Sequence, residues 1–265
     1  MTTGAARYTE ERHTVAETEL YLLKAGGGSP LLVLHGEEGF EGWLSFHEAL
    51  SEDATVYAPS HPGYGHTDAP DWISTVPHQA VFYNWFLQEA GIGPVNLVGT
   101  GVGGWIAAQM AVMCPDRIRR LVLVGAAGLR PEHEEIFDIF ITPWTQVIER
   151  SFHDPQKCPE YQRIYGSGPI PEFGGIREAA KTMTIRMCYR PYMYDPALPG
   201  MLAKVRVPTL LVWGAEDRIV PVECGQLYGR AIPGALLRTI DQCGHWAHLE
   251  KPAELAGVVR KFLSS

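Results

Sequence analysis

The chain has 265 residues, of which 46% are hydrophobic, and its formal net charge is −8. This length is enough to bury a substantial core within one domain. The acidic balance and the absence of clustered Lys or Arg argue against binding to nucleic acid or to an anionic membrane surface. The sequence also contains no apolar run of membrane-spanning length. We therefore expect an ordinary acidic globular protein.

The amino-terminal sequence and the cysteines indicate a compartment. Residues 1–14 carry acidic and polar residues where a signal peptide has an apolar core. The five cysteines are odd in number and show no C-x-x-C spacing, which is typical of reduced packing residues. The sequence therefore predicts a cytoplasmic protein. It does not indicate an oligomeric state.

Short apolar runs with β-branched residues alternate with segments of helical periodicity along most of the chain. The segment Val76–Ala90 has Phe82, Trp85 and Phe86 at helical spacing, so we expect this aromatic stripe in the core. The other expected elements are an edge strand over Thr14–Leu23, strands at Leu31–Leu34, Ala54–Ala58, Val95–Val98, Leu121–Val124, Val207–Trp213 and Ala235–Ile240, and helices at Trp43–Leu50, Ile176–Cys188, Val222–Ala231 and the carboxyl end.

This alternation of strands and helices predicts an α/β fold with a mostly parallel, doubly wound sheet. Residues 130–200 differ in texture, because they are rich in proline and aromatic residues and contain no convincing strand. Such a stretch between two regular βα runs indicates an inserted helical cap. We expect residues 1–129 and 201–265 to form the core and residues 130–200 to form the cap.

The segment from Pro94 to Met113 reads as a strand, a tight glycine-rich turn and a helix, and two motifs fit it. Gly99, Gly101 and Gly104 match the G-x-G-x-x-G spacing of dinucleotide-binding turns. That motif belongs in the first βα turn of its unit and is followed by an acidic residue after the next strand, and neither holds here. We therefore expect no nicotinamide or flavin cofactor.

The second motif is the nucleophile elbow, G-x-S-x-G, in which a strained strand-to-helix turn exposes a serine. The sequence Gly99-Thr100-Gly101-Val102-Gly103 has both outer glycines but carries Gly101 at the nucleophile position. Thr100 has the only adjacent hydroxyl, and the elbow geometry points its side chain away from the site. The sequence thus predicts an elbow that lacks its nucleophile.

Two candidate catalytic residues follow later strands, at the edge where α/β sheets bind ligands. Asp217 comes after the strand ending at Trp213, and His245 comes after the strand ending at Ile240. A histidine that transfers protons near neutral pH needs a carboxylate to fix its tautomer. The chain order of elbow, acid and histidine matches the Ser…Asp…His order of α/β-hydrolases. We predict that Asp217 and His245 converge beside Gly101.

With these residues in place, the chain resembles the capped α/β-hydrolase superfamily, which includes esterases, lactonases and hydrolases of ring-cleavage products. The resemblance covers nearly the whole chain outside the cap. It rests on His35-Gly36, which is similar to the oxyanion loop, and on the segments Ser60–Thr67, Trp213–Pro221 and Gly244–Pro252. It implies the α/β-hydrolase fold, a small-molecule substrate and no metal or cofactor. The departure from the family pattern is Gly101.

The resemblance also implies an oxyanion hole formed by the backbone N–H groups of Val102 and Glu37. The side chains of Glu37 and Glu38 lie beside this hole, and we expect them to be solvated loop acids. His248, three residues after His245, is expected to be a packing or surface residue.

The cap contains the candidate substrate-binding residues. Trp144 and Tyr189 could line a pocket between the cap and the sheet. Arg186 and Arg190 lie four residues apart on the predicted helix end, where they could bind a substrate carboxylate. Surface ion pairs are the commoner role for such arginines, and both alternatives stay open.

Three hypotheses for function follow. In the first hypothesis, the chain is an inactivated variant of a hydrolase that acts on a small ester, a lactone or a carbon–carbon bond, with glycine in place of the nucleophilic serine. Alternatively, glycine is native and His245 activates a water molecule lodged in the space of the serine side chain. The third hypothesis is a non-catalytic small-molecule-binding protein, against which the intact acid and histidine argue.

Overall fold

The structure is a computed structural model that describes residues 8–166 and 175–265. The predicted cap includes residues 167–174, which lie outside the described part, as do residues 1–7 of the amino-terminal segment. None of the helices in the described part combines the length and the apolar character needed to cross a lipid bilayer.

Eight strands form one sheet in the order β1-β2-β4-β3-β5-β6-β7-β8. The pairs β1–β2 and β2–β4 are antiparallel, and all other neighbours are parallel, as expected for an α/β fold. The strands are β1 (Thr9–Val15), β2 (Thr18–Ala25), β3 (Ser29–Leu34), β4 (Ala54–Pro59), β5 (Val95–Thr100), β6 (Ile118–Val124), β7 (Thr209–Gly214) and β8 (Leu236–Ile240).

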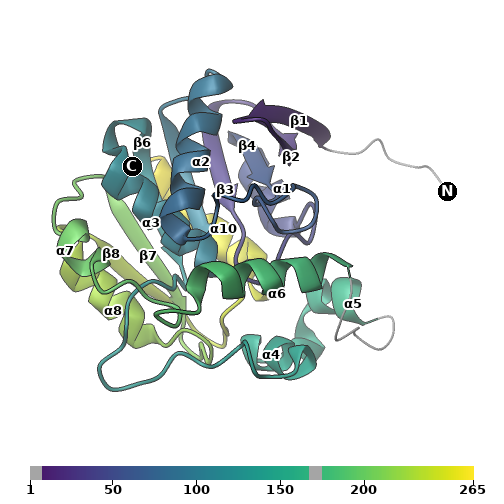
Figure 1. The fold of residues 1–265 in the computed structure, drawn as a ribbon. Helices are drawn as coiled ribbons and strands as arrows, with labels where there is room; N and C mark the ends of the chain where they lie inside the picture. The colour runs from purple at the N-terminus through teal and green to yellow at the C-terminus, as the bar shows by residue number, and fades with distance from the viewer. Residues whose placement is uncertain (1–7, 167–174) are drawn as a thin grey trace.

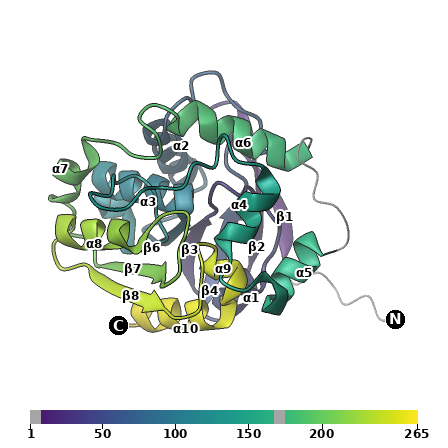
Figure 2. The same ribbon diagram turned by 90° about the horizontal axis from the view of Figure 1, so that it is seen from below.

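Helices cover both faces of the sheet. Figure 2 shows α1 and α10 on one face and α2, α3 and α8 on the other. The helices are α1 (Ser45–Ser51), α2 (Val76–Glu89), α3 (Gly101–Met113), α4 (Trp144–Ser151), α5 (Pro159–Tyr165), α6 (Gly175–Cys188), α7 (Leu198–Leu202), α8 (Val222–Ala231), α9 (Ala247–Glu250) and α10 (Pro252–Leu263).

The central strands are buried on both faces, because helices pack against each side of them. All residues of β5 and β7 are buried. Such strands read as continuous apolar runs, and this pattern made them visible in the sequence. The predicted parallel sheet is confirmed.

Two local predictions were wrong. The single edge strand expected over Thr14–Leu23 is a hairpin, because the chain turns at Ala16 and Glu17, both of which have positive φ. In the predicted aromatic stripe of α2, Phe82 and Phe86 are fully buried, whereas Trp85 is 41% exposed. Trp85 packs instead against the side chain of Trp72, with the ring centroids 5.3 Å apart.

Helices α4, α5 and α6 lie between β6 and β7 in the sequence, and α4 and α6 lie across one end of the sheet (Figure 1). The contacts of α6 place it over the carboxyl ends of β3 and β4. A β-carbon at Gly39, in the loop after β3, would touch Ala180, and one at Gly63, in the loop after β4, would press on Met183. This is the edge of the sheet at which the elbow, Asp217 and His245 are found.

Candidate active site

The turn between β5 and α3 has the geometry of a nucleophile elbow. Gly101, its central residue, has φ +49°, a left-handed conformation that favours glycine. A β-carbon at Gly103 would overlap the carbonyl oxygens of Leu34 and His35, so β3 and α3 approach each other too closely for a side chain there. The backbone therefore has the strained form that presents a residue at the carboxyl edge of the sheet.

Asp217 and His245 form a hydrogen-bonded pair at this edge. Oδ2 of Asp217 lies 2.7 Å from Nδ1 of His245, and both side chains are buried. Oδ1 of Asp217 accepts hydrogen bonds from the amides of Ile219 and Val220, each at 2.9 Å. These bonds fix the carboxylate, and the carboxylate fixes the imidazole. The two residues that the chain order singled out are thus brought together.

The Glu37 carboxylate lies on the other side of the imidazole. Its Oε1 accepts hydrogen bonds from Nε2 of His245 at 2.9 Å and from the indole N–H of Trp246 at 3.3 Å. Its Oε2 accepts a hydrogen bond from the amide of Val102 at 3.2 Å. A β-carbon at Gly101 would overlap Oε2. The carboxylate therefore occupies the space in which an elbow serine would place its side chain.

The expectation that Glu37 and Glu38 are solvated loop acids was wrong. Glu37 is 2% exposed and Glu38 is 1% exposed. A carboxylate reaches such a position only when hydrogen bonds and opposite charge replace its hydration. For Glu37 the replacement comes from His245, Trp246 and the Val102 amide.

The carboxylates of Asp217 and Glu37 favour the charged form of His245, and His245 favours the charged form of Glu37. Burial alone would lower the pKa of His245, but the carboxylates of Asp217 and Glu37 raise it well above its ordinary value. Burial alone would raise the pKa of Glu37, but His245 lowers it to about 2. Both ring nitrogens of His245 face carboxylate oxygens, an arrangement that suits a doubly protonated ring. The directions of the two pKa shifts and this geometry both favour an imidazolium between two carboxylates.

The two amides expected to form the oxyanion hole both bond to the Glu37 carboxylate. The Val102 amide does so at 3.2 Å, and the backbone amide of Glu37 bonds to its own side chain, which helps to lower the pKa of that group. These donors therefore bind an internal anion in this structure. Their role toward a substrate stays a prediction.

Thr100 lies apart from this centre. Its hydroxyl donates to the carbonyl oxygen of Leu34 at 3.5 Å, which agrees with the expectation that its side chain points away from the site.

A second buried carboxylate–imidazole pair lies next to the first. Oε1 of Glu38 accepts from the amide of Gly36 at 3.0 Å and lies 3.2 Å from Nε2 of His248. His248 is 4% exposed, so it is a buried residue that contacts an acid. The pair borders a cavity of about 20 Å³ that is also lined by His47 and Thr100. The contact between Glu38 and His248 links α9 to the loop after β3, which also carries Glu37.

The candidate substrate-binding residues of the cap separate in space. Trp144 is buried, and its ring lies beside that of Trp246, with centroids 6.1 Å apart. Tyr189, Arg186 and Arg190 are exposed. Arg186 donates to the carbonyl oxygen of Asp71, and the Arg190 guanidinium lies 5.3 Å from the ring centroid of Tyr189. Of the four, Trp144 is the one that the structure brings to a residue in contact with Glu37.

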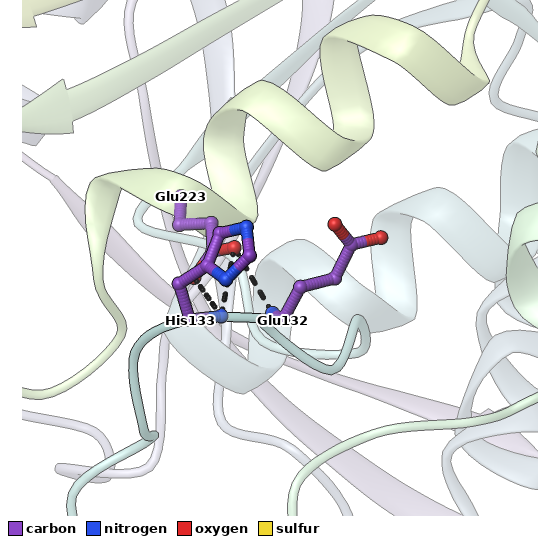
Figure 3. A group of neighbouring side chains, drawn as sticks. All are labelled: Glu132, His133 and Glu223. Carbon is purple, nitrogen blue, oxygen red and sulfur yellow. Dashed lines mark hydrogen bonds between the residues drawn. The ribbon is translucent and has the colours of Figure 1, made fainter.

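One group in the described part of the chain could bring three metal-ligand atoms together, namely Glu132, His133 and Glu223. Figure 3 shows that the Glu223 carboxylate points at backbone amides of the other two residues. Its oxygens accept from the amides of Glu132, His133 and Glu134 at 2.9–3.1 Å. The carboxylate is therefore already engaged as a clamp on this loop, and we assign no metal to it.

Sequence reasoning assigned the side chains of Glu37 and Glu38 to solvent and did not single out Trp246. A signal was present, because an acid follows the His35-Gly36 dipeptide directly in a chain that lacks the elbow serine. A missing nucleophile together with a carboxylate in the oxyanion loop would have suggested that one compensates for the other.

With this geometry established, comparison with known proteins defines the class. Residues 31–258 match the alpha/beta hydrolase family, and the chain belongs to that family. It is 29% identical over 269 residues to 2-hydroxy-6-oxo-6-(2'-aminophenyl)hexa-2,4-dienoic acid hydrolase of Metapseudomonas resinovorans, covering 97% of this chain and 91% of that protein. It is 28% identical over 269 residues to 2-hydroxy-6-oxo-2,4-heptadienoate hydrolase of Pseudomonas putida, covering 94% and 93%.

Solved structures agree with the fold. A serine hydrolase involved in carbazole degradation superimposes with a TM-score of 0.79 at 25% identity, covering 97% of this chain and 99% of that one. An esterase from Exiguobacterium antarcticum also superimposes with a TM-score of 0.79, at 20% identity, covering 97% and 100%. These relatives are hydrolases by name, and the predicted α/β-hydrolase fold is confirmed.

Proposed function

We propose that this protein is a hydrolase that works with glycine at position 101, and that Glu37, His245 and Asp217 form its reactive centre. The observation that carries the proposal is the fit of the Glu37 carboxylate between His245, the Val102 amide and Gly101. Glycine at 101 leaves the room that this carboxylate fills. The fit favours native glycine over an inactivated serine enzyme, and it replaces the lodged water of the second hypothesis with a carboxylate.

The charge state supplies both partners of acid–base catalysis without a serine. Glu37 is a carboxylate that can accept a proton from water, and protonated His245 can donate a proton to a leaving group. A substrate carbonyl that displaces Glu37 from the Val102 amide gains that donor for its developing oxyanion. Displacement also raises the basicity of Glu37, because the carboxylate loses a hydrogen bond to its charged form. Asp217 stabilises the imidazolium and fixes the ring.

The proposed substrates are small esters, lactones or compounds with a carbon–carbon bond next to a carbonyl group. The names of the relatives support this range, since two are dienoate hydrolases and one is an esterase. We further propose that residues 130–200 act as a cap. Contacts of α6 with the loops after β3 and β4, and of Trp144 with Trp246, support this division. The buried centre admits substrate when these contacts open.

Purified protein and the variants Glu37→Gln, His245→Gln and Asp217→Asn test the proposal. The substrates are p-nitrophenyl acetate and butyrate, a small lactone and a 2-hydroxy-6-oxo-dienoate. We expect turnover of at least one substrate, and a loss of about a hundredfold or more in each variant. Glu89→Gln, which alters an exposed acid on α2, is the control and should keep full activity.

Two outcomes would contradict the proposal. If no substrate is turned over while ligands still bind, the protein is a binding protein of the same fold. If intact-protein mass spectrometry traps an acyl group on any residue, water does not attack the carbonyl directly.

A further inference from the structure

A pocket lies at the amino-terminal edge of the sheet, at the opposite end of the strands from Glu37 and His245. Its volume is about 400 Å³, and it lies between the first halves of β3, β4 and β5 and the helices α1 and α10. Figure 2 shows α1 and α10 together on this face of the sheet. The volume falls within the range of small-molecule binding sites. The pocket shares no lining residue with the reactive centre.

The strand register places the sheet residues of this pocket on one face. In the parallel pairs, Ser29 lies opposite Ala54, and Leu31 lies opposite Asn96. Residues paired in this way point to the same side of a sheet, as do residues two apart on one strand. All four line the pocket together with residues of α1 and α10, so their side chains point toward these helices.

Asn96 is the polar residue of this group that lies within the sheet. It is 8% exposed, and its neighbours in register are Leu31 on β3 and Arg120 on β6. Its side-chain amide forms no hydrogen bond with another group in residues 8–166 and 175–265. Burial of an amide is costly unless its donors and its acceptor find partners. The pocket that Asn96 lines is the space from which such a partner can reach it.

The charged groups at the pocket already pair with one another. Nε and Nη2 of Arg260 lie 2.6 Å from Oδ2 of Asp53, and Nη1 lies 2.6 Å from Oε2 of Glu52. The nearby guanidinium of Arg120 lies against the ring of Phe262, 5.4 Å from its centroid. A ligand carboxylate would meet the two acids, and a ligand ammonium would meet the Arg260 guanidinium. The pocket therefore favours an uncharged ligand.

The remaining walls are apolar. They are formed by Leu31 on β3, Leu50 on α1 and Leu263 on α10. An apolar ring that enters the pocket is removed from water when these leucines cover it, which favours binding. The walls thus suit an apolar body, and Asn96 suits a polar group at its end.

We propose that this pocket is a binding site for a small uncharged carboxamide attached to an apolar ring. The ligand carbonyl accepts from Nδ2 of Asn96, and the ligand N–H donates to Oδ1 of Asn96. A carboxamide satisfies both halves of this side chain at once, because each amide carries a donor next to an acceptor. The ring lies among the three leucines. The site does not depend on the proposed hydrolysis, because it lies at the other edge of the sheet.

Benzamide is the probe, because it joins a carboxamide to one apolar ring. NMR titration should give saturable shifts of the backbone signals of Leu31, Asn96 and Leu263, with a Kd of about 1 to 10 mM for so small a ligand. Nuclear Overhauser effects from the benzamide ring to the methyl groups of Leu31, Leu50 and Leu263 should locate it. Benzoate and benzylammonium have a similar size but carry a charge, so they should bind about tenfold more weakly or worse.

Two variants test the residues of the pocket. Asn96→Leu keeps the size of the side chain but removes both hydrogen-bonding groups, so it should weaken benzamide binding about tenfold or more. Ala54→Leu places additional side-chain volume in the pocket and should abolish binding. Gln88→Leu, which removes an exposed amide on α2, is the matched control and should bind benzamide as the unaltered protein does.

Several results would overturn the proposal. No saturable shift with benzamide would show that Asn96 meets water alone, and unchanged binding in Asn96→Leu and Ala54→Leu would place the ligand elsewhere. Equal affinity for benzoate or benzylammonium would overturn the uncharged class. If Asn96→Leu does not fold, Ala54→Leu and the contacts with the leucine methyl groups still decide. Loss of benzamide binding in Asn96→Leu should leave ester, lactone and dienoate hydrolysis unchanged, so the two proposals fail separately.

Discussion

The carboxylate of Glu37 and the missing side chain of Gly101 occupy the same space. Oε2 of Glu37 would overlap a β-carbon at position 101, and the carboxylate contacts the histidine and the elbow amide that a serine would use. The Glu37 carboxylate and a serine side chain at position 101 would therefore compete for the same volume and the same hydrogen-bonding groups. Changing one of them has consequences that depend on the other.

We predict that Gly101→Ser alone lowers stability and gives weak serine-type activity. The positive φ of residue 101 should cost about 1 to 3 kcal/mol in the free energy of unfolding once a side chain is present. The serine must also push Glu37 away from His245 and Val102. Urea unfolding measures the stability, and the burst of p-nitrophenol from p-nitrophenyl acetate measures acylation.

The double variant Glu37→Ala/Gly101→Ser separates two effects of the serine. One is backbone strain at residue 101, and the other is the obstruction of His245 and the Val102 amide by the Glu37 carboxylate. Removal of the Glu37 carboxylate frees the Val102 amide and gives the serine access to His245, so the burst should be larger than in Gly101→Ser. A double variant that folds but shows no burst would contradict the assignment of His245 and Asp217 as a functional pair. An increase in the stability of Gly101→Ser would contradict the argument from backbone strain.

The second prediction concerns the protonation of His245. In the unaltered protein, Asp217 and Glu37 hold its pKa well above 6.5, so the ring should remain protonated at neutral pH. Glu37→Gln removes one of these carboxylates and should lower the pKa of His245. Titration of the histidine ring signals by NMR measures this change. An unchanged titration of His245 in Glu37→Gln would show that the two groups are not coupled.

The same pair makes stability depend on pH in two windows. The pKa of Glu37 is lowered from 4.5 to about 2, so its contribution is present above pH 4.5 and is lost as pH falls toward 2. The pKa of His245 is raised, so its contribution is present below pH 6.5 and is lost as pH rises through its folded value. We expect the difference in Tm between the unaltered protein and Glu37→Gln to be largest near pH 5 and to shrink in acid.

The sequence was sufficient to predict the parallel sheet and the pairing of Asp217 with His245. Buried parallel strands are continuous apolar runs, and chain order places Asp217 and His245 at one edge of the sheet. The sequence was insufficient to predict the burial of Glu37, because an isolated acid in a loop is normally solvated. The partners of Glu37 are Val102, 65 residues away, and His245, 208 residues away. Only the folded chain brings them near enough to make burial of the carboxylate favourable.

Trp85 is the opposite case, because the sequence predicted that it is buried and the structure leaves it partly exposed. Helical periodicity placed it on an aromatic stripe, but α2 buries Phe82 and Phe86 and leaves Trp85 at the edge of its buried face. Which residues at the margin of a helix become buried depends on the neighbouring segments, here on Trp72. Local pattern does not contain that information.

The fourth prediction is that the group of Glu132, His133 and Glu223 holds the loop in place without a metal. Glu223→Gln leaves a side chain of similar size but provides a neutral oxygen and an amide group for the three backbone donors. We expect this variant to increase proteolysis in the segment around Glu132. Addition of Zn²⁺ to the unaltered protein should leave its Tm unchanged, and a saturable increase in Tm that Glu223→Gln abolishes would contradict this assignment.

The last prediction concerns Glu38 and His248, the buried pair that supports the loop carrying Glu37. Removal of one partner leaves the other buried without the polar group that it contacts at 3.2 Å, so His248→Ala should lower the free energy of unfolding by about 1 to 3 kcal/mol. Glu38→Gln should lower it less, because the amide oxygen can still accept from the Gly36 amide and keep its contact with His248. Since the two side chains interact, the losses should not add in the double variant. Urea unfolding of the two single variants and the double variant gives this coupling. Additive losses would show that the contact carries no stability, and an unchanged NMR titration of His245 in both single variants would show that the pair does not position Glu37.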